Sequence, residues 1–462
     1  MSGLHPSFVT LLARGAISSL DARLRRTLMH RSPSPNDGVR SRTRDIVQRV
    51  RLGGDSALRE LAREFDGVTL DALEVPRVLW VRALDALEPS LRTALERAAR
   101  NITTVHSAMR PTAIETSPEP GIIVGRRPDP LARVGVYAPG GRAAYPSSLF
   151  MGAIPARVAG VGEVVVCSPP GADGLPSAVV LAAAELAGVD RLFALGGAGA
   201  IAAMALGTPS VPRVDRIVGP GNAYVAEAKL QLVSDVAIDA PAGPSELLVL
   251  ADDRANADVM ARELLAQAEH DPDAAVVAVL TGTGAAALAK AVEFALSTLI
   301  DQAPRADIVR ASLRARGAIV TSPSLADGVA FANAWAAEHL LLVVREDVRA
   351  STLASLRNVG TVFVGESSSV AFGDYMTGAN HVLPTAGAAR CYSGLSTLDF
   401  VRWTTWQTVS LDAAARMAED VGRFADAEGL PGHAAAARAW SVPRDLKTAD
   451  VTTSDATTSA AR

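Results

Sequence analysis

The chain contains the runs VGVYAPGG (134–141), VGEVVVCSPP (161–170), RLFALGG (191–197) and VDRIVGPGN (214–222), each of which leads into Gly or Pro. Short β-branched and apolar runs of this kind predict strands. Between them lie Ala-rich segments long enough for helices, such as LFMGAIPARVAG and SAVVLAAAELAG. Because strands and helices alternate, we expect a parallel sheet and a first α/β domain at residues 134–243.

A second series of the same kind follows in the sequence. Its expected strands are SELLVLAD, AAVVAVLTG, GAIVTS, LLLVV and TVFVGE, and its expected helices include ADVMARELLAQAEH and GAAALAKAVEFALSTLI. The two halves are similar in pattern, which suggests a duplicated unit. We therefore expect an α/β fold with two parallel sheets, the second at residues 244–398.

The flanking regions have a different pattern. From Phe8 to Ile102, apolar residues recur at helical spacing, which predicts a helical N-terminal region, residues 1–133, packed around a core formed later in the chain. A small helical C-terminal piece, residues 399–446, is predicted by the segment FVRWTTWQTVSLDAAARMAEDVGRFADAEGLPGHAAAARAW. The last residues, 447–462, are rich in Ser, Thr and Ala without an apolar period, so we expect a disordered tail.

Composition excludes several classes of protein. The 462 residues are 49% hydrophobic and 20% charged, with a net charge of -4, so nothing favours a nucleic acid or an anionic membrane as partner. The two cysteines, Cys167 and Cys391, are too few for a disulfide framework. Charged residues interrupt the N-terminus, and no apolar run is long enough to span a bilayer. We expect a cytoplasmic enzyme of two or more domains.

Four residues form a candidate metal site. Gln267 and His270 are three residues apart at the end of an expected helix, Asp374 lies in an expected loop after a strand, and His433 lies in an expected loop before a helix. Taken alone, the Gln267–His270 pair and His433 are more typical of helix ends than of metal ligands, and Asp374 is as typical of a turn as of a ligand. Together they form a nitrogen and oxygen ligand set without thiolate, which suits zinc or manganese.

Two adjacent residues are candidates for proton transfer. Glu338 and His339 follow an expected helix and precede an apolar strand. A neighbouring carboxylate and imidazole provide the groups that repeated proton transfer requires. The alternative is an exposed Glu beside a His that caps the helix.

Two Gly-containing turns are candidates for binding a phosphate-bearing cofactor. GPGNAYVAEAKLQL (219–232) places backbone N–H groups near the start of an expected helix. GGAGAIA (196–202) matches G-x-G-x-x-A, although close packing of a helix on a strand explains this match equally well. Ser245, in a Gly-Pro turn before a strand, fits a substrate contact or a simple cap.

Six segments together resemble the histidinol dehydrogenase family. In chain order they are GPGNAYVAEAKLQL, DAPAGPSE, LAQAEHDPDA, NAWAAEHL, FGDYMTGANHVLPT and EGLPGHAAAARAW, and the similarity extends from about Arg44 to Arg444. The resemblance implies oxidation of L-histidinol through histidinal to L-histidine by two NAD, in the last steps of histidine biosynthesis. It also implies two incomplete Rossmann-like domains and a homodimer that binds one Zn²⁺ per subunit.

The resemblance also implies roles for individual residues. The expected zinc ligands are Gln267, His270, Asp374 and His433. His339 is expected to take the alcohol proton, and Glu338 to activate the water that attacks the aldehyde. The expected substrate contacts, besides the zinc ligands and His339, are Ser245, His381 and Glu428. The expected NAD contacts are Tyr137 and Asn222, with position 199 beside them. The piece that bears His433 is expected to come from the partner subunit, so that the active site is shared.

The chain departs from the family's pattern at one position. Where the family commonly has a Gln that helps to bind NAD, this chain has Gly199, so NAD affinity is weaker or another residue reaches the cofactor. Three other functions compete: a related zinc and NAD alcohol dehydrogenase acting on a sulfonated diol, a metal-dependent hydrolase, and a two-lobed binding protein. The presence of Ser245, His381 and Glu428 argues against the first.

Overall fold

The computed structural model describes residues 9–31, 36–140, 144–241 and 243–441. Within them the chain divides into two compact units. The first unit comprises residues 1–110 and 130–402, and the second comprises residues 111–129 and 403–462. The expected tail at 447–462 lies outside the described residues.

A five-stranded parallel sheet forms the first lobe of the first unit, in the order β6-β5-β4-β7-β8. The strands are β4 (Arg133–Tyr137), β5 (Glu163–Ser168), β6 (Arg191–Ala194), β7 (Arg216–Val218) and β8 (Ala237–Ile238). The helices that connect them are α5 (Pro146–Ala159), α6 (Ala178–Leu186), α7 (Gly197–Leu206) and α8 (Ala223–Gln231). The order and the alternation confirm the expected parallel α/β arrangement.

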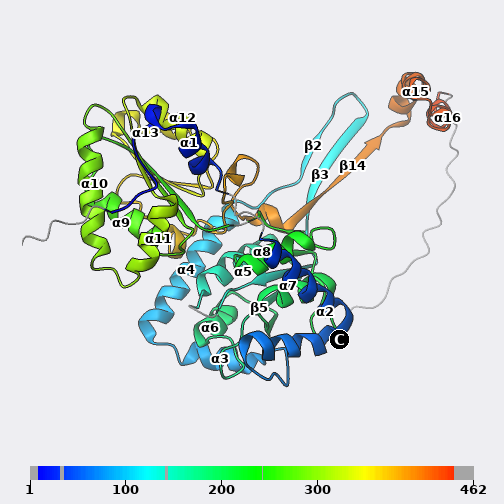
Figure 1. Cartoon of the computed structure of the whole chain (residues 1–462). Helices are drawn as coiled ribbons and strands as arrows, with labels where there is room; N and C mark the ends of the chain where they lie inside the picture. The colour runs from blue at the N-terminus through cyan, green and yellow to red at the C-terminus, as the bar shows by residue number, and fades with distance from the viewer. Residues whose placement is uncertain (1–8, 32–35, 141–143, 242, 442–462) are drawn as a thin grey trace, which may run out of the picture. The chain divides into compact units, whose positions relative to one another are not determined.

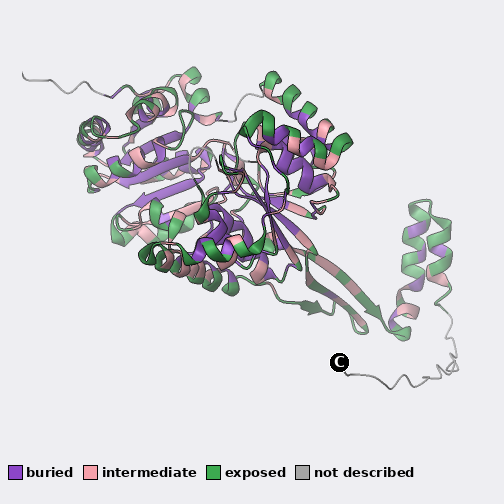
Figure 2. Cartoon of the chain, turned by 90° about the horizontal axis from the view of Figure 1, so that it is seen from below, coloured by how far each residue is buried: buried purple, intermediate pink, exposed green. Residues whose placement is uncertain are grey.

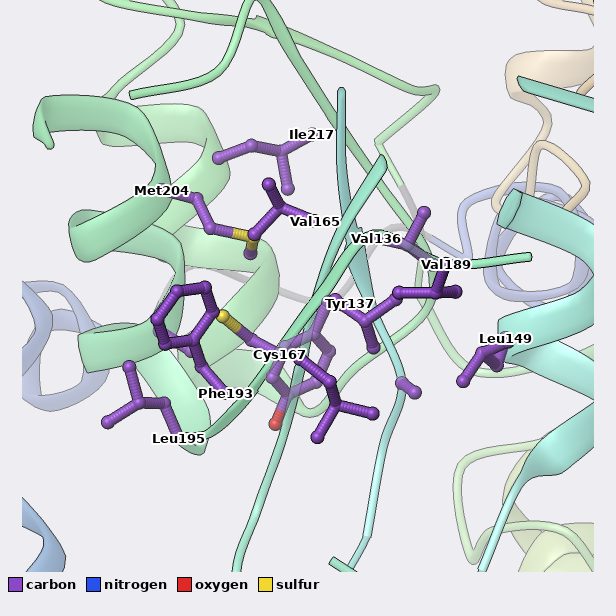
Figure 3. Packing of buried hydrophobic residues seen from close by; sticks show 14 of the residues in the cluster. Val136, Tyr137, Leu149, Val165, Cys167, Val189, Phe193, Leu195, Met204 and Ile217 are labelled. Carbon is purple, nitrogen blue, oxygen red and sulfur yellow. The ribbon is translucent and has the colours of Figure 1, made fainter. Parts of the chain in front are cut away.

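The core of this lobe explains why its strands are apolar throughout. Val164, Val165 and Val166 are consecutive in β5 and all fully buried, because helices cover both faces of a parallel sheet. Figure 3 shows the packing of this core, with Met204 of α7 and Phe193 of β6 among the buried side chains.

Residues 37–108 of the expected helical N-terminal region pack on the same lobe (Figure 1). Its helices are α2 (Asp37–Leu61), α3 (Arg77–Asp85) and α4 (Pro89–Ala108). Helix α2 packs on α7 and α8, α3 on α6, and α4 on α5. These contacts agree with the prediction that the N-terminal helices cover a core formed later in the chain.

The second lobe contains a six-stranded parallel sheet in the order β1-β11-β10-β9-β12-β13. Its strands are β1 (Ala13–Ala16), β9 (Glu246–Asp252), β10 (Ala275–Thr281), β11 (Ala318–Ser322), β12 (His339–Val343) and β13 (Thr361–Val364). Its helices are α1 (Ala22–Met29), α9 (Ala257–Ala268), α10 (Ala285–Ile300), α11 (Ala306–Arg316), α12 (Leu325–Trp335), α13 (Glu346–Ser355) and α14 (Val370–Tyr375). Figure 2 shows the buried strands of the sheets and the exposed outer sides of the surrounding helices.

The expectation of a helical region at residues 1–133 was wrong for residues 13–16, 114–116 and 122–130, which form strands. Ala13 to Ala16 form an edge strand that pairs with Ala318 to Thr321 of β11. This pairing joins residues about 300 positions apart, and it satisfies backbone groups that β11 would otherwise leave open at the edge of the sheet.

The second unit contains a three-stranded sheet and two helices. The strands are β2 (Ile114–Thr116), β3 (Ile122–Pro130) and β14 (Val401–Val409), in the order β14-β3-β2 (Figure 1). The helices are α15 (Leu411–Ala427) and α16 (Pro431–Arg438).

The expectation of helix at residues 401–409 was therefore also wrong. This segment, VRWTTWQTV, is rich in β-branched and aromatic residues, which suit a pleated surface. The absence of a side chain at Gly125 of β3 leaves room for the indole of Trp406, and Arg126 lies 4.4 Å from the ring centre of Trp403. The helix begins only after Ser410, whose side chain accepts from Ala413 N. The proposed domain boundaries at 133, 243, 398 and 446 stay predictions.

In the described part of the chain, no helix combines the length and apolar character that a membrane span requires.

Candidate functional site

The Glu338–His339 pair lies at the amino-terminal edge of the second sheet. Helix α12 ends at Trp335, Ala336 follows with a φ of 56°, and β12 begins at His339. Glu338 and His339 are only 6% and 4% exposed. Glu338 Oε2 lies 3.3 Å from His339 Nδ1. The alternative of an exposed Glu beside a helix-capping His is therefore wrong.

The backbone of Glu246 holds both members of the pair. Its N–H donates to Glu338 Oε2 at 2.6 Å, and its carbonyl oxygen lies 3.0 Å from His339 Nδ1. Because a carbonyl oxygen only accepts, Nδ1 must carry a hydrogen and donate it. In the neutral ring, Nε2 is consequently the basic nitrogen. It is buried and has no hydrogen-bond partner among the described residues.

The charges around His339 oppose the effect of its burial. Burial lowers the pKa of His339, but the nearby Glu338 and Asp374 carboxylates and the hydrogen bond to Glu246 raise it to about 9. Asp374 Oδ1 is 3.9 Å from His339 Nε2. The neighbouring carboxylates thus outweigh burial in their effect on the pKa of His339.

Ser245 and Gln267 extend the network from the pair toward α9. Ser245 Oγ donates to Glu338 Oε2 at 2.8 Å, and Gln267 Nε2 donates to Ser245 Oγ. Gln267 is 2% exposed, and its contact with Ser245 leaves the amide oxygen available to a metal. The Ser245 hydroxyl thus links an expected metal ligand to the expected acid–base pair.

The remaining expected residues of the second lobe lie around α14 and α9. Asp374 lies in α14 and not in a loop, and His381 Nδ1 donates to its carbonyl oxygen at 2.9 Å. Burial lowers the pKa of His381. His270 lies two residues beyond the end of α9, where its side chain is exposed. The structure thus brings Asp374 and His381 to His339, whereas His270 is at the surface.

Glu428 and His433 belong to the second unit and are both exposed there. Glu428 is the C-cap of α15, and its successor Gly429 has a φ of 72°. His433 is in the first turn of α16, whereas the sequence analysis placed it in a loop before the helix. Pro431 explains the difference, because proline fits the first turn of a helix.

The donor chemistry of the expected ligands suits zinc; Gln267, His270 and Asp374 lie in the first unit and His433 lies in the second. Among the described residues, no group of three or more His, Cys, Asp or Glu side chains is placed to hold a metal. Imidazole, carboxylate and amide oxygen are nevertheless ligands that zinc accepts. The buried, unpartnered His339 Nε2 beside Asp374 marks a place for an incoming polar group.

A cavity of about 780 Å³ lies at the carboxyl ends of the strands in the first lobe. Tyr137, Gly199 and Asn222, the three positions expected at the NAD site, all line it. Tyr137 Oη accepts from Gly197 N at 3.0 Å, and burial raises the pKa of Tyr137 to about 12. The Asn222 side chain caps α8 by accepting from Tyr224 N at 3.0 Å. The cavity is thus at the position where open α/β sheets bind ligands.

The packing of α2 accounts for the glycine at position 199. A Cβ atom there would lie 3.1 Å from Leu61 Cδ1 and 3.7 Å from Leu58 Cδ2. Both leucines are in α2 and line the same cavity. The space next to Gly199 is therefore already filled by apolar side chains of this chain.

Sequence reasoning missed two buried ion pairs beside these sites. Arg31 pairs with Glu246 at 2.7 Å, and Lys229 pairs with Asp239 at 2.6 Å. Lys229 Nζ also donates to Gly219 O at 2.5 Å, while Gly219 N donates to Asp239 Oδ2 at 2.8 Å. The second pair thus fixes the Gly-Pro-Gly turn. No clear signal in the sequence predicted this pair, because Lys229 lies two residues after another charged residue, Glu227, in GPGNAYVAEAKLQL.

Comparison with known proteins agrees with this structure. Residues 29–440 match the sequence profile of histidinol dehydrogenase. The chain is 44% identical over 418 residues to the histidinol dehydrogenase of Methanothermobacter thermautotrophicus, covering 90% of this chain and 97% of that protein. It is 47% identical over 413 residues to that of Halobacterium salinarum, covering 89% and 95%.

A solved structure is similar over the same extent. The crystal structure of histidinol dehydrogenase from Elizabethkingia anophelis gives a TM-score of 0.88 at 31% identity, covering 93% of this chain and 98% of that one. Fold and site define a two-lobed α/β protein with a buried Glu338–His339 pair at one sheet and a cavity at the other. The chain belongs to the histidinol dehydrogenase family, as the six sequence segments predicted.

Proposed function

We propose that this chain oxidises L-histidinol through histidinal to L-histidine, with two NAD reduced in succession, in the last steps of histidine biosynthesis. The observation that carries the proposal is the buried Glu338–His339 pair, whose Nε2 has no partner among the described residues, in a chain that belongs to this family. Four-electron oxidation of a primary alcohol needs proton transfer at each stage, and the pair provides two groups for it.

His339 has the geometry of a base for the alcohol. Its Nδ1–H donates to Glu246 O, which fixes the ring and presents Nε2 to the hydroxyl. Nε2 takes the hydroxyl proton as a hydride leaves the carbinol carbon for the first NAD, giving the aldehyde. The carboxylate of Glu338 stabilises the resulting imidazolium at 3.3 Å.

Glu338 acts in the second oxidation. It takes a proton from the water that attacks the aldehyde carbon, while the His339 imidazolium returns its proton to the aldehyde oxygen. The neutral His339 then takes a hydroxyl proton from the hydrated aldehyde as this is oxidised, with the second NAD as hydride acceptor. Ser245 Oγ and Glu246 N both donate to Glu338 Oε2, so they hold the carboxylate in place for that task. The products of the two steps are one carboxylic acid and two NADH.

The cofactors have sites among these residues. Gln267, His270 and Asp374, with His433, would hold one Zn²⁺, which when bound acts as a Lewis acid and orients the amino and imidazole nitrogens of the substrate. His381, Ser245 and Glu428 would contact the substrate. Tyr137, Asn222 and the backbone at Gly199 would hold NAD, whose nicotinamide accepts the hydride; all three line the 780 Å³ cavity.

The proposed active site is shared between two copies of the chain in a cytoplasmic homodimer. Glu428 and His433 lie in the second unit, in which Phe424 of α15 is 70% exposed and Leu430, the residue before α16, is 41% exposed. Apolar side chains exposed to this degree favour contact with another protein surface. In this proposal the second unit of one subunit supplies His433 and Glu428 to the site of its partner.

The deciding experiment measures NADH formed and histidinol consumed by purified, zinc-loaded protein. We expect two NADH for each histidinol. Absence of NADH production at saturating NAD, with bound metal confirmed, would contradict the proposal. Oxidation of a sulfonated diol in place of histidinol would instead support the related dehydrogenase.

A further inference from the structure

Arg31 is a buried arginine that the proposed reaction does not use. It follows α1 and its side chain is 3% exposed, while that of its partner Glu246 is 2% exposed. Arg31 Nε donates to Glu246 Oε1 at 2.7 Å and Nη2 donates to Oε2 at 3.0 Å. This is a bidentate pair, which fixes both direction and distance.

Glu246 connects this ion pair to the Glu338–His339 pair. Its backbone N–H and carbonyl contact Glu338 and His339 respectively, as described above. Its side chain is held at Oε1 by Arg31 and by Ala386 N, which donates at 2.9 Å. A single residue at the start of β9 therefore contacts both members of the pair through its backbone and is itself fixed through its side chain.

Arg31 also contacts the segment that leads to Glu338. Its Nη2 donates to Trp335 O at 2.7 Å, and its guanidinium carbon lies 3.6 Å from the centre of the Trp335 ring. The indole N–H of Trp335 donates to Leu28 O at 3.1 Å, back to α1. Trp335 is the last residue of α12, three positions before Glu338. Arg31 thus joins the two backbone segments that determine where the pair lies.

The contribution of the buried Arg31–Glu246 ion pair to stability does not by itself explain why the chain contains it. Burying two charges costs solvation energy, and well-packed apolar residues of similar size often replace such pairs without loss of stability. A bidentate guanidinium that also stacks on an indole defines geometry more narrowly than an apolar contact does.

We propose that Arg31 is a positioning residue, which acts through Glu246 and Trp335 to fix the Glu338–His339 pair in its working geometry. This inference rests on the proposed function for its kinetic consequences. Its structural content, that Arg31 determines the environment of the His339 ring, is independent of the substrate.

The test compares Arg31→Met and Arg31→Lys with Arg77→Met in the full-length, metal-loaded protein. Arg77 is a matched control, because it also makes a bidentate pair, with Glu185 at 3.0 Å for both contacts, but is 59% exposed. The first readout is the nuclear magnetic resonance spectrum of ¹⁵N-labelled histidine, in which His339→Asn identifies the His339 signals. We expect both Arg31 variants to shift these signals and Arg77→Met to leave them unchanged.

The second readout is steady-state kinetics. A displacement of reacting groups by about 1 Å costs up to about 100-fold in rate, so we expect kcat to fall about 10- to 100-fold in Arg31→Met. The KM for NAD should stay unchanged, because its cavity is in the other lobe. Arg31→Lys should fall between Arg31→Met and the parent, and added guanidinium should restore part of the rate of Arg31→Met.

The outcomes separate the two proposals. If the parent does not oxidise histidinol but the His339 signals shift in the Arg31 variants, the function fails and the positioning role stands. Unchanged His339 signals in folded Arg31→Lys would overturn the positioning role, whatever the activity. If Arg31→Met does not fold, Arg31→Lys decides alone.

Discussion

The Lys229–Asp239 pair allows a quantitative test of how the Gly-Pro-Gly turn is held. The side chains are 7% and 6% exposed, and Nζ lies 2.6 Å from Oδ1. Replacing Lys229 by Met keeps most of the apolar stem but leaves the Asp239 carboxylate buried without its cation. Removing one partner of a buried ion pair typically costs about 3–5 kcal/mol, so we expect a loss of that size in Lys229→Met.

Arg310→Met provides the matched control. Arg310 lies 2.7 Å from Asp301, almost the same distance, but these side chains are 44% and 62% exposed. Exposed pairs contribute about 0–1 kcal/mol, because water and salt screen them. The two variants therefore differ mainly in burial, and the difference between them isolates its effect.

The assay is urea unfolding followed by circular dichroism, with variants compared only where their denaturant slopes agree. The double variant Lys229→Met/Asp239→Asn should recover part of the loss, because Asn removes the unpaired charge and keeps an oxygen for Gly219 N. Lys229→Met within about 1 kcal/mol of Arg310→Met would refute the reasoning, since burial would then have no cost. A double variant that is no more stable than Lys229→Met would also refute it.

Three further predictions concern the candidate sites. His270→Asn should lose bound zinc and His339→Asn should keep it; metal analysis with the reverse result would contradict the division between ligand and base. Gly199→Gln should destabilise the chain by about 1–3 kcal/mol in thermal unfolding, because its Cβ would lie 3.1 Å from Leu61 Cδ1. A double-mutant cycle with Leu61→Ala should show coupling, and strict additivity would exclude this contact as the cause. Ser245→Ala should cost about 1–3 kcal/mol, because buried Gln267 loses its acceptor, and full stability in urea unfolding would rule that contact out.

The strands of the two sheets could be predicted because burial on both faces leaves a clear pattern. β5 and β10 are continuous apolar runs that end at turn residues, and both lie where the sequence placed strands. The errors fell where long-range pairing decides the structure. Residues 13–16 form a strand only because β11 offers an open edge, and residues 401–409 only because β3 lies beside them.

The candidate site was predictable in its residues but not in its environment. The dipeptide Glu338–His339 was recognisable in the sequence. Its burial and its hydrogen bond from Glu246 N could not be predicted, because they depend on the register of β9 against β12, in which Leu247 pairs with His339. Arg31 was missed for a related reason. The sequence alone does not distinguish a solvated arginine from one buried in an ion pair. The partner of Arg31, Glu246, is 215 positions away.

The two lobes share a topology but differ at the edge where open α/β sheets bind ligands. The order β6-β5-β4-β7-β8 of the first sheet recurs as β11-β10-β9-β12-β13 in the second, which supports a duplicated unit. In the second lobe, helix-entry N–H groups are occupied by the chain's own carboxylates, since Asp252 accepts from Arg345 N and Glu366 from Asn256 N.

Two helix entries of the first lobe have neutral partners. Gly197 N, at the start of α7, donates to the Tyr137 hydroxyl, and α8 is capped by the Asn222 amide. A helix N-terminus favours an anion, and a carboxylate already bound there repels a second one. An anion is therefore less opposed at the starts of α7 and α8 than at the starts of α9 and α13. The Glu338–His339 pair lies at the opposite, amino-terminal edge of the second sheet, so the two lobes present different chemistry at opposite strand ends.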